Sequence, residues 1–112
     1  MESMVKSDGA EKTISTEVIA MLTIFSADEE LRRKALPYVN LEKEEVDWYG
    51  IAQNDFGGGH CGAIAWAKAI WTGEVPSVNP FERAYAMGPN LRRAVLTALA
   101  NRWGFEVRFR AV

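Results

Sequence analysis

The residues of this chain best suited to chemistry lie in one short segment, 57–62, which reads Gly-Gly-Gly-His-Cys-Gly. It contains the only histidine, His60, and the only cysteine, Cys61, and runs directly into an alanine-rich stretch, 63–71, with the character of a helix. Glycines let the backbone approach another group closely, and the first turn of a helix presents unpaired N–H groups. Such a segment suits an anion, a thiolate or a tight packing contact.

The glycine pattern matches the dinucleotide-binding motif G-x-G-x-x-G, and Glu82 follows about 20 residues later, as that motif requires. The context argues against this function, because the motif follows a buried parallel strand whereas residues 46–54 read as helix. A chain of 112 residues with one or two strands also cannot form a doubly wound sheet. We therefore expect no cofactor at Gly57, Gly58 and Gly59.

Thiol catalysis and metal binding are the other chemistries to consider at this segment. The first turn of a helix can activate a thiol, but Cys61 needs a histidine base, and the adjacent His60 points its side chain elsewhere. We expect Cys61 to be a small buried residue that allows close packing, and His60 to be a polar or capping residue at the helix start. One His and one Cys, with Asp47 and Asp55 nearby, have no recognised zinc spacing, so we expect no metal site and no enzyme.

Two tryptophans of the alanine-rich helix suggest a binding surface. Trp66 and Trp71 cannot face the same way, so at least one is expected to be exposed unless the helix is buried all round. An exposed Trp beside small residues is typical of a binding anchor. The leading hypothesis is a non-catalytic protein-interaction module with a partner of unknown identity. Its surface would consist of Trp66, Trp71, Gly57, Gly58, Gly59 and His60.

The alternative hypothesis is nucleic-acid binding. Residues 80–103 resemble a helix-turn-helix in outline, with a short helix, a Gly-Pro-Asn turn at 88–90 and a longer helix, and a strand over 105–110 would form a wing. Phosphate binding would require five arginines on one surface, which are Arg92, Arg93, Arg102, Arg108 and Arg110. If these arginines instead neutralise the acidic segment 41–54 of the same molecule, nucleic-acid binding is not expected.

Capping signals predict where the helices begin. Apolar residues over 13–25 fit a helix that starts near Ser15 or Thr16, although their β-branched content leaves a strand possible. The sequence 26–29 has the capping-box pattern with Ser26 as N-cap, and Pro37 ends the helix that follows. Asn40 is expected to cap a helix over 41–54, because acidic residues fill its first turns. The alanine-rich helix is expected to end at Thr72 and Gly73. Asn79, followed by Pro80, is a strong helix start.

The last helix and the chain end carry two further patterns. Asn90 is expected to cap a helix whose apolar stripe is Leu91, Val95, Leu99 and Trp103, with Gly104 ending it. Residues 105–110 then alternate between apolar and charged side chains, as a half-buried strand does. Such a strand needs a partner, which would be residues 13–25, residues 75–78 or another copy of the chain, giving a homodimer through the C-terminal strand.

Together these elements predict a mainly α fold with a short C-terminal β element, α+β being possible. We expect a compact single-domain helical bundle of four or five helices over 13–112, preceded by a disordered tail over 1–12. The composition, with 48% hydrophobic and 25% charged residues, is that of a folded protein. No apolar run is long enough to span a membrane and no signal-peptide pattern is present, so we expect a cytoplasmic protein.

The net charge of −2 conceals an uneven distribution. Residues 1–60 carry 6 Lys/Arg and 12 Asp/Glu, whereas residues 61–112 carry 7 Lys/Arg and 3 Asp/Glu. An acidic first half that packs beside a basic second half is the simplest explanation, and a basic nucleic-acid face is the other.

Overall fold

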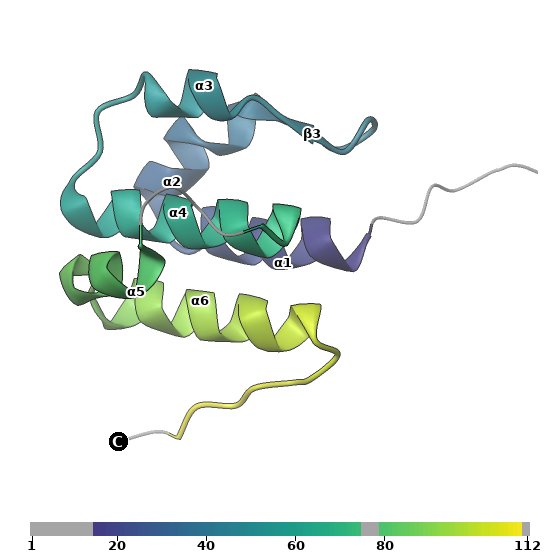
Figure 1. Cartoon of the computed structure of the whole chain (residues 1–112), viewed down its shortest axis with the longest axis vertical. Coiled ribbons are helices and arrows are strands. Elements are labelled where there is room, and N and C mark those ends of the chain that lie inside the picture. Colours follow the sequence, from purple (N-terminus) through teal and green to yellow (C-terminus); the bar gives the residue numbers. More distant parts are fainter. Residues whose placement is uncertain (1–14, 75–78, 111–112) are drawn as a thin grey trace, which may run out of the picture.

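The computed structural model describes residues 15–74 and 79–110 (Figure 1). The tail predicted over 1–12 and residues 75–78, one of the possible strand partners, lie outside the described residues. Three long helices form the centre of the fold: α1 (Thr16–Phe25), α4 (Gly58–Thr72) and α6 (Pro89–Arg102). α1 packs extensively against both α4 and α6, and α4 also contacts α6. The fold is therefore mainly α, as the sequence predicts.

The side chains buried between these helices are small or aliphatic, with one aromatic ring. Val18, Met21, Ile24 and Phe25 come from α1 and are almost fully buried. α4 contributes alanines, which let it lie close to α1, and α6 contributes Leu91, Val95 and Ala98. Burial of this apolar surface stabilises the bundle.

Shorter elements cover the two sides of this core. On one side lie α2 (Glu29–Lys34), the 3₁₀ turn η1 (Leu36–Tyr38), strands β2 (Val39–Asn40) and β3 (Glu45–Val46), and α3 (Trp48–Ala52). On the other side α5 (Pro80–Arg83) and the 3₁₀ turn η2 (Ala84–Ala86) pack against α4 and lead into α6 (Figure 1). The described residues thus contain six α-helices, of which three are short.

Several predicted helix ends are confirmed. Ser15 is the N-cap of α1, where its Oγ accepts a hydrogen bond from the amide of Val18 at 3.3 Å. Asn79 caps α5 by accepting from the amides of Phe81 and Glu82. Gly73 ends α4 in the left-handed conformation at φ 74°, which glycine adopts without strain.

Two other predicted caps are each wrong by two residues. Asp28, not Ser26, is the N-cap of α2, because its Oδ1 accepts from the Leu31 amide at 2.8 Å. Ser26 instead ends α1. α6 begins at Pro89 with Gly88 as N-cap, and the side chain of Asn90 donates to the carbonyl of Ala27 at 2.9 Å. Asn90 therefore ties the start of α6 to the α1–α2 connection.

The helix predicted over 41–54 is wrong. Residues 39–46 form an antiparallel hairpin in which Val39 pairs with Val46 and Asn40 with Glu45. Asn40 does bond a nearby amide, but its Oδ1 accepts from Lys43 inside the hairpin turn at 3.1 Å. The N-cap of the helix that does form, α3, is Asp47, which accepts from the Gly50 amide at 2.9 Å.

The β structure that is described is consequently not C-terminal. Residues 105–110 form no strand within the described part of the chain. Gly104 has φ 85° and turns the chain out of α6, after which the segment doubles back below α6 in Figure 1. The Phe105 amide still donates to the carbonyl of Ala100 at 2.8 Å, but no backbone hydrogen bond joins residues 106–110 to another described residue.

Candidate functional site

The glycine segment serves close helix packing. Gly57 is the N-cap of α4, and the next glycines form its first turns. A Cβ added at Gly59 would lie 2.8 Å from the carbonyl oxygen of Ala86, and one at Gly62 would lie 2.9 Å from that of Arg83. Real Cβ atoms do not approach backbone so closely, so these positions require glycine for α5 and η2 to rest on α4. Of the uses that the sequence suggested, the tight packing contact is the one found.

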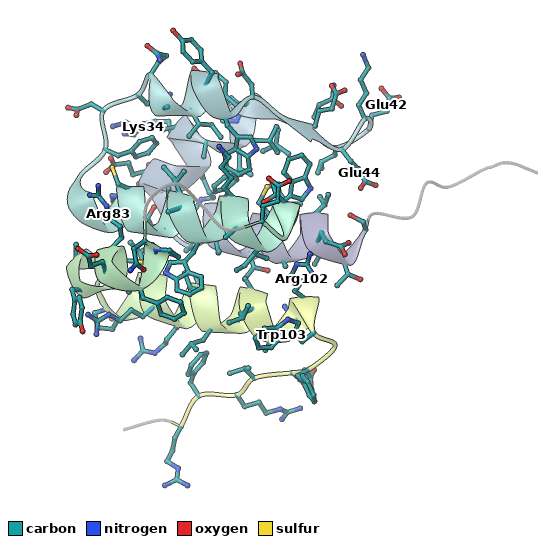
Figure 2. The ribbon with its side chains drawn as sticks, viewed as in Figure 1. Lys34, Glu42, Glu44, Arg83, Arg102 and Trp103 are labelled. Atoms are coloured by element: carbon teal, nitrogen blue, oxygen red, sulfur yellow. The ribbon has the colours of Figure 1, made fainter. Side chains whose placement is uncertain are left out.

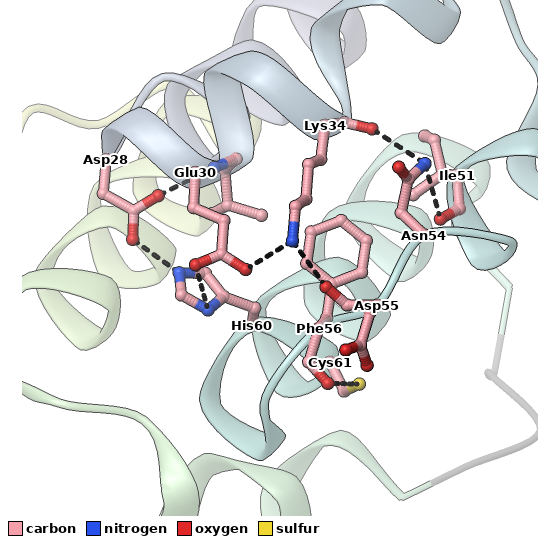
Figure 3. Close-up of polar contacts among 10 residues, drawn as sticks. Asp28, Glu30, Lys34, Ile51, Asn54, Asp55, Phe56, His60 and Cys61 are labelled. Carbon is pink, nitrogen blue, oxygen red and sulfur yellow. Dashed lines mark hydrogen bonds and ion pairs between the residues drawn. The ribbon is translucent and has the colours of Figure 1, made fainter.

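His60 joins the start of α4 to the start of α2 (Figure 3). Its Nε2 lies 2.6 Å from Oδ2 of Asp28, and its Nδ1 lies 3.9 Å from Oε1 of Glu30. Partial burial of Asp28 acts to raise its pKa. The hydrogen bonds from the Leu31 amide and from His60, together with nearby positive charge, outweigh it and hold that pKa below its ordinary value. His60 is thus a polar residue at the helix start, with its partner on another element.

Lys34 extends this cluster to the loop before α4. Its Nζ lies 3.2 Å from Oε2 of Glu30, donates to the carbonyl of Asp55 at 2.7 Å and sits 5.4 Å from the centre of the Phe56 ring (Figure 3). These contacts hold α2 against residues 54–60. Each ionisable side chain of the cluster contacts another member of the cluster, which is typical of a structural network.

Cys61 is exposed, so the prediction that it is a small buried residue is wrong. Its Sγ contacts the carbonyl oxygen of Phe56 at 3.8 Å, and no hydrogen bond links it to His60 in the described structure. The tight packing at this end of α4 is made by Gly59 and Gly62 instead. Across residues 15–74 and 79–110, no three His, Cys, Asp or Glu side chains converge in a way that would hold a metal ion.

The two tryptophans of α4 both pack against the core and are only partly accessible. The Nε1 of Trp66 donates to the carbonyl of Pro80 at 2.9 Å, and its ring meets Phe81 edge to face at 4.9 Å. Trp71 lies 5.9 Å from the ring of Trp48 on the other side of α4. They do face different ways, but short elements cover both sides of α4, so neither ring is the exposed anchor that the sequence suggested.

Trp103, at the end of α6, is the most exposed tryptophan of the chain (Figure 2). Two further aromatic residues, Phe105 and Phe109, follow it in the sequence. Trp103 is 63% exposed, Phe105 67%, Leu96 53% and Phe109 44%. Leu96 and Trp103 are seven residues apart, so they lie on the same side of α6. We refer to Leu96, Trp103, Phe105 and Phe109 as the C-terminal apolar surface.

A pocket of about 320 Å³ opens beside Trp103, between the C-terminal halves of α4 and α6. Most of its lining is apolar, and it includes Trp66, Ile70, Leu99 and Trp103. Its charged members are Glu74 and Arg102, and the Nε of Arg102 is already bonded to the carbonyl of Ile70. The pocket thus continues the apolar character of the surface around Trp103.

Sequence reasoning missed Trp103 because it assigned this residue to the buried stripe of α6. Residues four apart on a helix of 3.6 residues per turn are rotated by about 40° from each other, so three such steps turn the stripe by about 120°. Leu91 and Val95 are buried, Leu99 is partly buried and Trp103 has turned into solvent. Counting this rotation would have identified the exposed residue.

The five arginines proposed for nucleic acid lie on α6 and on the segment that follows it, and three of them have partners in the same chain. Arg92 donates to the carbonyl of Ala84 at 3.3 Å, Arg102 to that of Ile70, and Arg108 lies 3.6 Å from Glu106. Arg93 and Arg110 are exposed. No described ion pair links any of the five to the acidic residues of 41–54, so the expected intramolecular neutralisation is not found.

Comparison with known proteins gives no match to any family model, curated protein or solved structure. Among the described residues, no helix combines the length and the apolar character needed to cross a membrane. Inference about function therefore starts from the surface geometry of this chain.

Proposed function

We propose that this protein is a non-catalytic protein-interaction module of the cytoplasm that binds through the C-terminal apolar surface. This moves the binding surface away from Trp66, Trp71 and the glycine segment, because both tryptophans and the glycines at 59 and 62 pack against the protein's own elements. The observation that carries the proposal is the exposure of Leu96, Trp103 and Phe105, each more than half accessible to solvent.

The chemistry of this surface favours a protein partner. Neighbouring exposed apolar side chains mark interaction sites on folded proteins, and aromatic residues contribute most of the binding energy at such interfaces. The pocket beside Trp103 offers an apolar recess at the edge of the surface. Of its two charged side chains, Arg102 is bonded to backbone and Glu74 is the other, and such a mostly apolar recess favours a contact surface rather than a reaction centre.

Site-specific photo-crosslinking in cells tests this proposal. A photoreactive amino acid replaces Trp103 in one variant and Tyr49 in a second, matched variant. Tyr49 is 77% exposed and lies on α3, on the other side of the core from α6 (Figure 1). We expect the variant at 103 to form protein adducts, including adducts with itself, in much higher yield than the variant at 49.

A second change links the adducts to the surface. Leu96→Ser, on the same side of α6 as position 103, should reduce the yield of the same adducts. Equal yields at positions 103 and 49 would overturn the proposal, as would adducts that Leu96→Ser leaves unchanged.

A further inference from the structure

The segment 105–110 has the side-chain pattern of a strand. Among the described residues, however, no strand lies beside it. Its polar side chains project into water, since those of Glu106 and Arg108 are 84% and 88% exposed. Between them Val107 is partly buried, and Phe109 is less exposed than Phe105. The segment therefore has one apolar and one charged side, as a strand on a protein surface has.

Within residues 15–74 and 79–110, the backbone of this segment meets no pairing partner. No backbone hydrogen bond joins residues 106–110 to another described residue, and such a row of free N–H and C=O groups is a template for a second strand. An extended partner strand would bind this segment through main-chain hydrogen bonds. The alternating side chains of residues 105–110 would select which partner binds.

The order of side chains from Phe105 to Phe109 is complementary to itself in the antiparallel direction. When two copies pair about Val107, Val107 faces its own copy, Phe105 faces Phe109 and Glu106 faces Arg108. Opposite charges and aromatic pairs directly across an antiparallel ladder are both stabilising. The Phe105–Phe109 and Glu106–Arg108 contacts each occur twice and the Val107 contact once, because the two-fold axis passes through the Val107 pair.

Other registers lose this complementarity. A shift that centres the pair on Glu106 or on Arg108 places like charges opposite each other at the axis. A shift by a single position brings apolar side chains opposite charged ones, since side chains alternate between the two sides of a strand. An in-register parallel pair would stack Glu106 on Glu106 and Arg108 on Arg108.

We propose that two copies of this chain form a symmetric dimer through an antiparallel ribbon of residues 105–109, with the two-fold axis at Val107. This rests on the proposed function, because it names a second copy as the partner of the C-terminal apolar surface. A two-stranded ribbon alone is marginally stable in water, so the exposed rings of Trp103, Phe105 and Phe109 must supply apolar contact.

A charge-exchange experiment on the full-length chain tests the ribbon. In Glu106→Arg, position 106 faces Arg108 of the second copy with like charge, and in Arg108→Glu, position 108 faces Glu106 with like charge. Analytical ultracentrifugation over a range of concentrations should show a wild-type dimer and a dissociation constant raised about tenfold or more in each variant. Because both side chains are exposed, circular dichroism should show unchanged helix content.

Mixing the two variants gives the decisive result. A heterodimer of Glu106→Arg with Arg108→Glu pairs arginine with glutamate at both positions, so the mixture should associate about as tightly as the wild type. Arg33→Glu is the matched control, because it makes the same charge change at an exposed position of α2 and should leave the wild-type dimer intact.

A wild-type chain that stays monomeric would overturn this proposal, and so would a dimer that neither variant weakens or a mixture that does not recover. The proposed function stands or falls separately. If the purified chain is monomeric while position 103 crosslinks to a different protein in cells, the surface binds another partner and only the homodimer is wrong.

Discussion

At the scale of single residues, Gly62 sets how closely α5 approaches α4. A Cβ at this position would lie 2.9 Å from the backbone oxygen of Arg83, and backbone cannot move aside as a flexible side chain can. We expect Gly62→Ala to lower the free energy of unfolding by about 1–2 kcal/mol, because the overlap exceeds the gain of about 1 kcal/mol that alanine brings to a helix. Urea denaturation measures this change.

Gly58→Ala is the matched control for Gly62→Ala. Its added Cβ would lie 3.4 Å from the Cβ of Ala86, which is ordinary van der Waals contact. This variant should be as stable as the wild type or slightly more stable. If the Gly62→Ala and Gly58→Ala proteins have the same free energy of unfolding, the packing of α5 does not depend on close approach at Gly62.

Asp28 combines two stabilising contacts, as N-cap of α2 and as partner of His60. Because its folded-state pKa is lower than its unfolded value, its charge stabilises the fold above the unfolded pKa of about 4. That contribution is lost as the pH falls through the lower folded-state pKa. We expect Asp28→Ala to cost about 1 kcal/mol at neutral pH, chiefly through the lost cap, and to reduce the fall in stability at acid pH.

Asp28→Asn separates the cap from the charge. Asparagine caps helices about as well as aspartate, so this variant should retain more stability at neutral pH than Asp28→Ala. It should still show the weaker acid dependence, since the titrating carboxyl is gone. Chemical denaturation repeated from neutral to acid pH measures both effects, and an acid dependence equal to that of the wild type would contradict the role given to Asp28.

At the scale of elements, the sequence correctly predicts those helix ends that are decided by residues close by in the sequence. Ser15, Gly73 and Asn79 act through hydrogen bonds or φ angles within a few positions of themselves. The hairpin over 39–46 could not be read this way. Asn40 bonds an amide three residues ahead in a turn much as it would at a helix start, so the local signal is the same for both structures.

Elements that depend on distant partners account for the remaining errors. Residues 41–54 do not form one helix, because Val39 pairs with Val46 and because η1 and α3 pack against the core. Of the apolar side chains that alternate over 105–110, only Val107 is partly buried whereas Phe105 and Phe109 are exposed, because alternation alone does not provide a neighbouring strand. The exposure of Trp103, by contrast, follows from the rotation of residues spaced four apart along α6, which is a local property of the sequence.

At the scale of the whole molecule, the acidic tip of the hairpin and the end of α6 lie in different parts of the fold (Figure 2). Glu42 and Glu44 extend from the tip of the hairpin, and Arg102 lies at the end of α6 beside Trp103 (Figure 2). Glu44 has a positive φ of 53°, which belongs to the tight turn at this tip. Arg102 is therefore separate from this acidic tip, and a basic surface away from acidic groups is what the alternative hypothesis of nucleic-acid binding requires.

The partners of the arginines argue for weak binding to a polyanion. Arg92 and Arg102 donate to carbonyl groups of their own chain and Arg108 lies beside Glu106, so few of the five guanidinium groups are available for phosphate. With a net charge of −2, we expect negligible retention on heparin at physiological salt. The measurement compares the wild type with Arg92→Ala/Arg93→Ala, which should elute at the same position. Strong retention that falls steeply with salt and disappears in the double variant would instead favour nucleic acid, because each neutralised phosphate releases counterions.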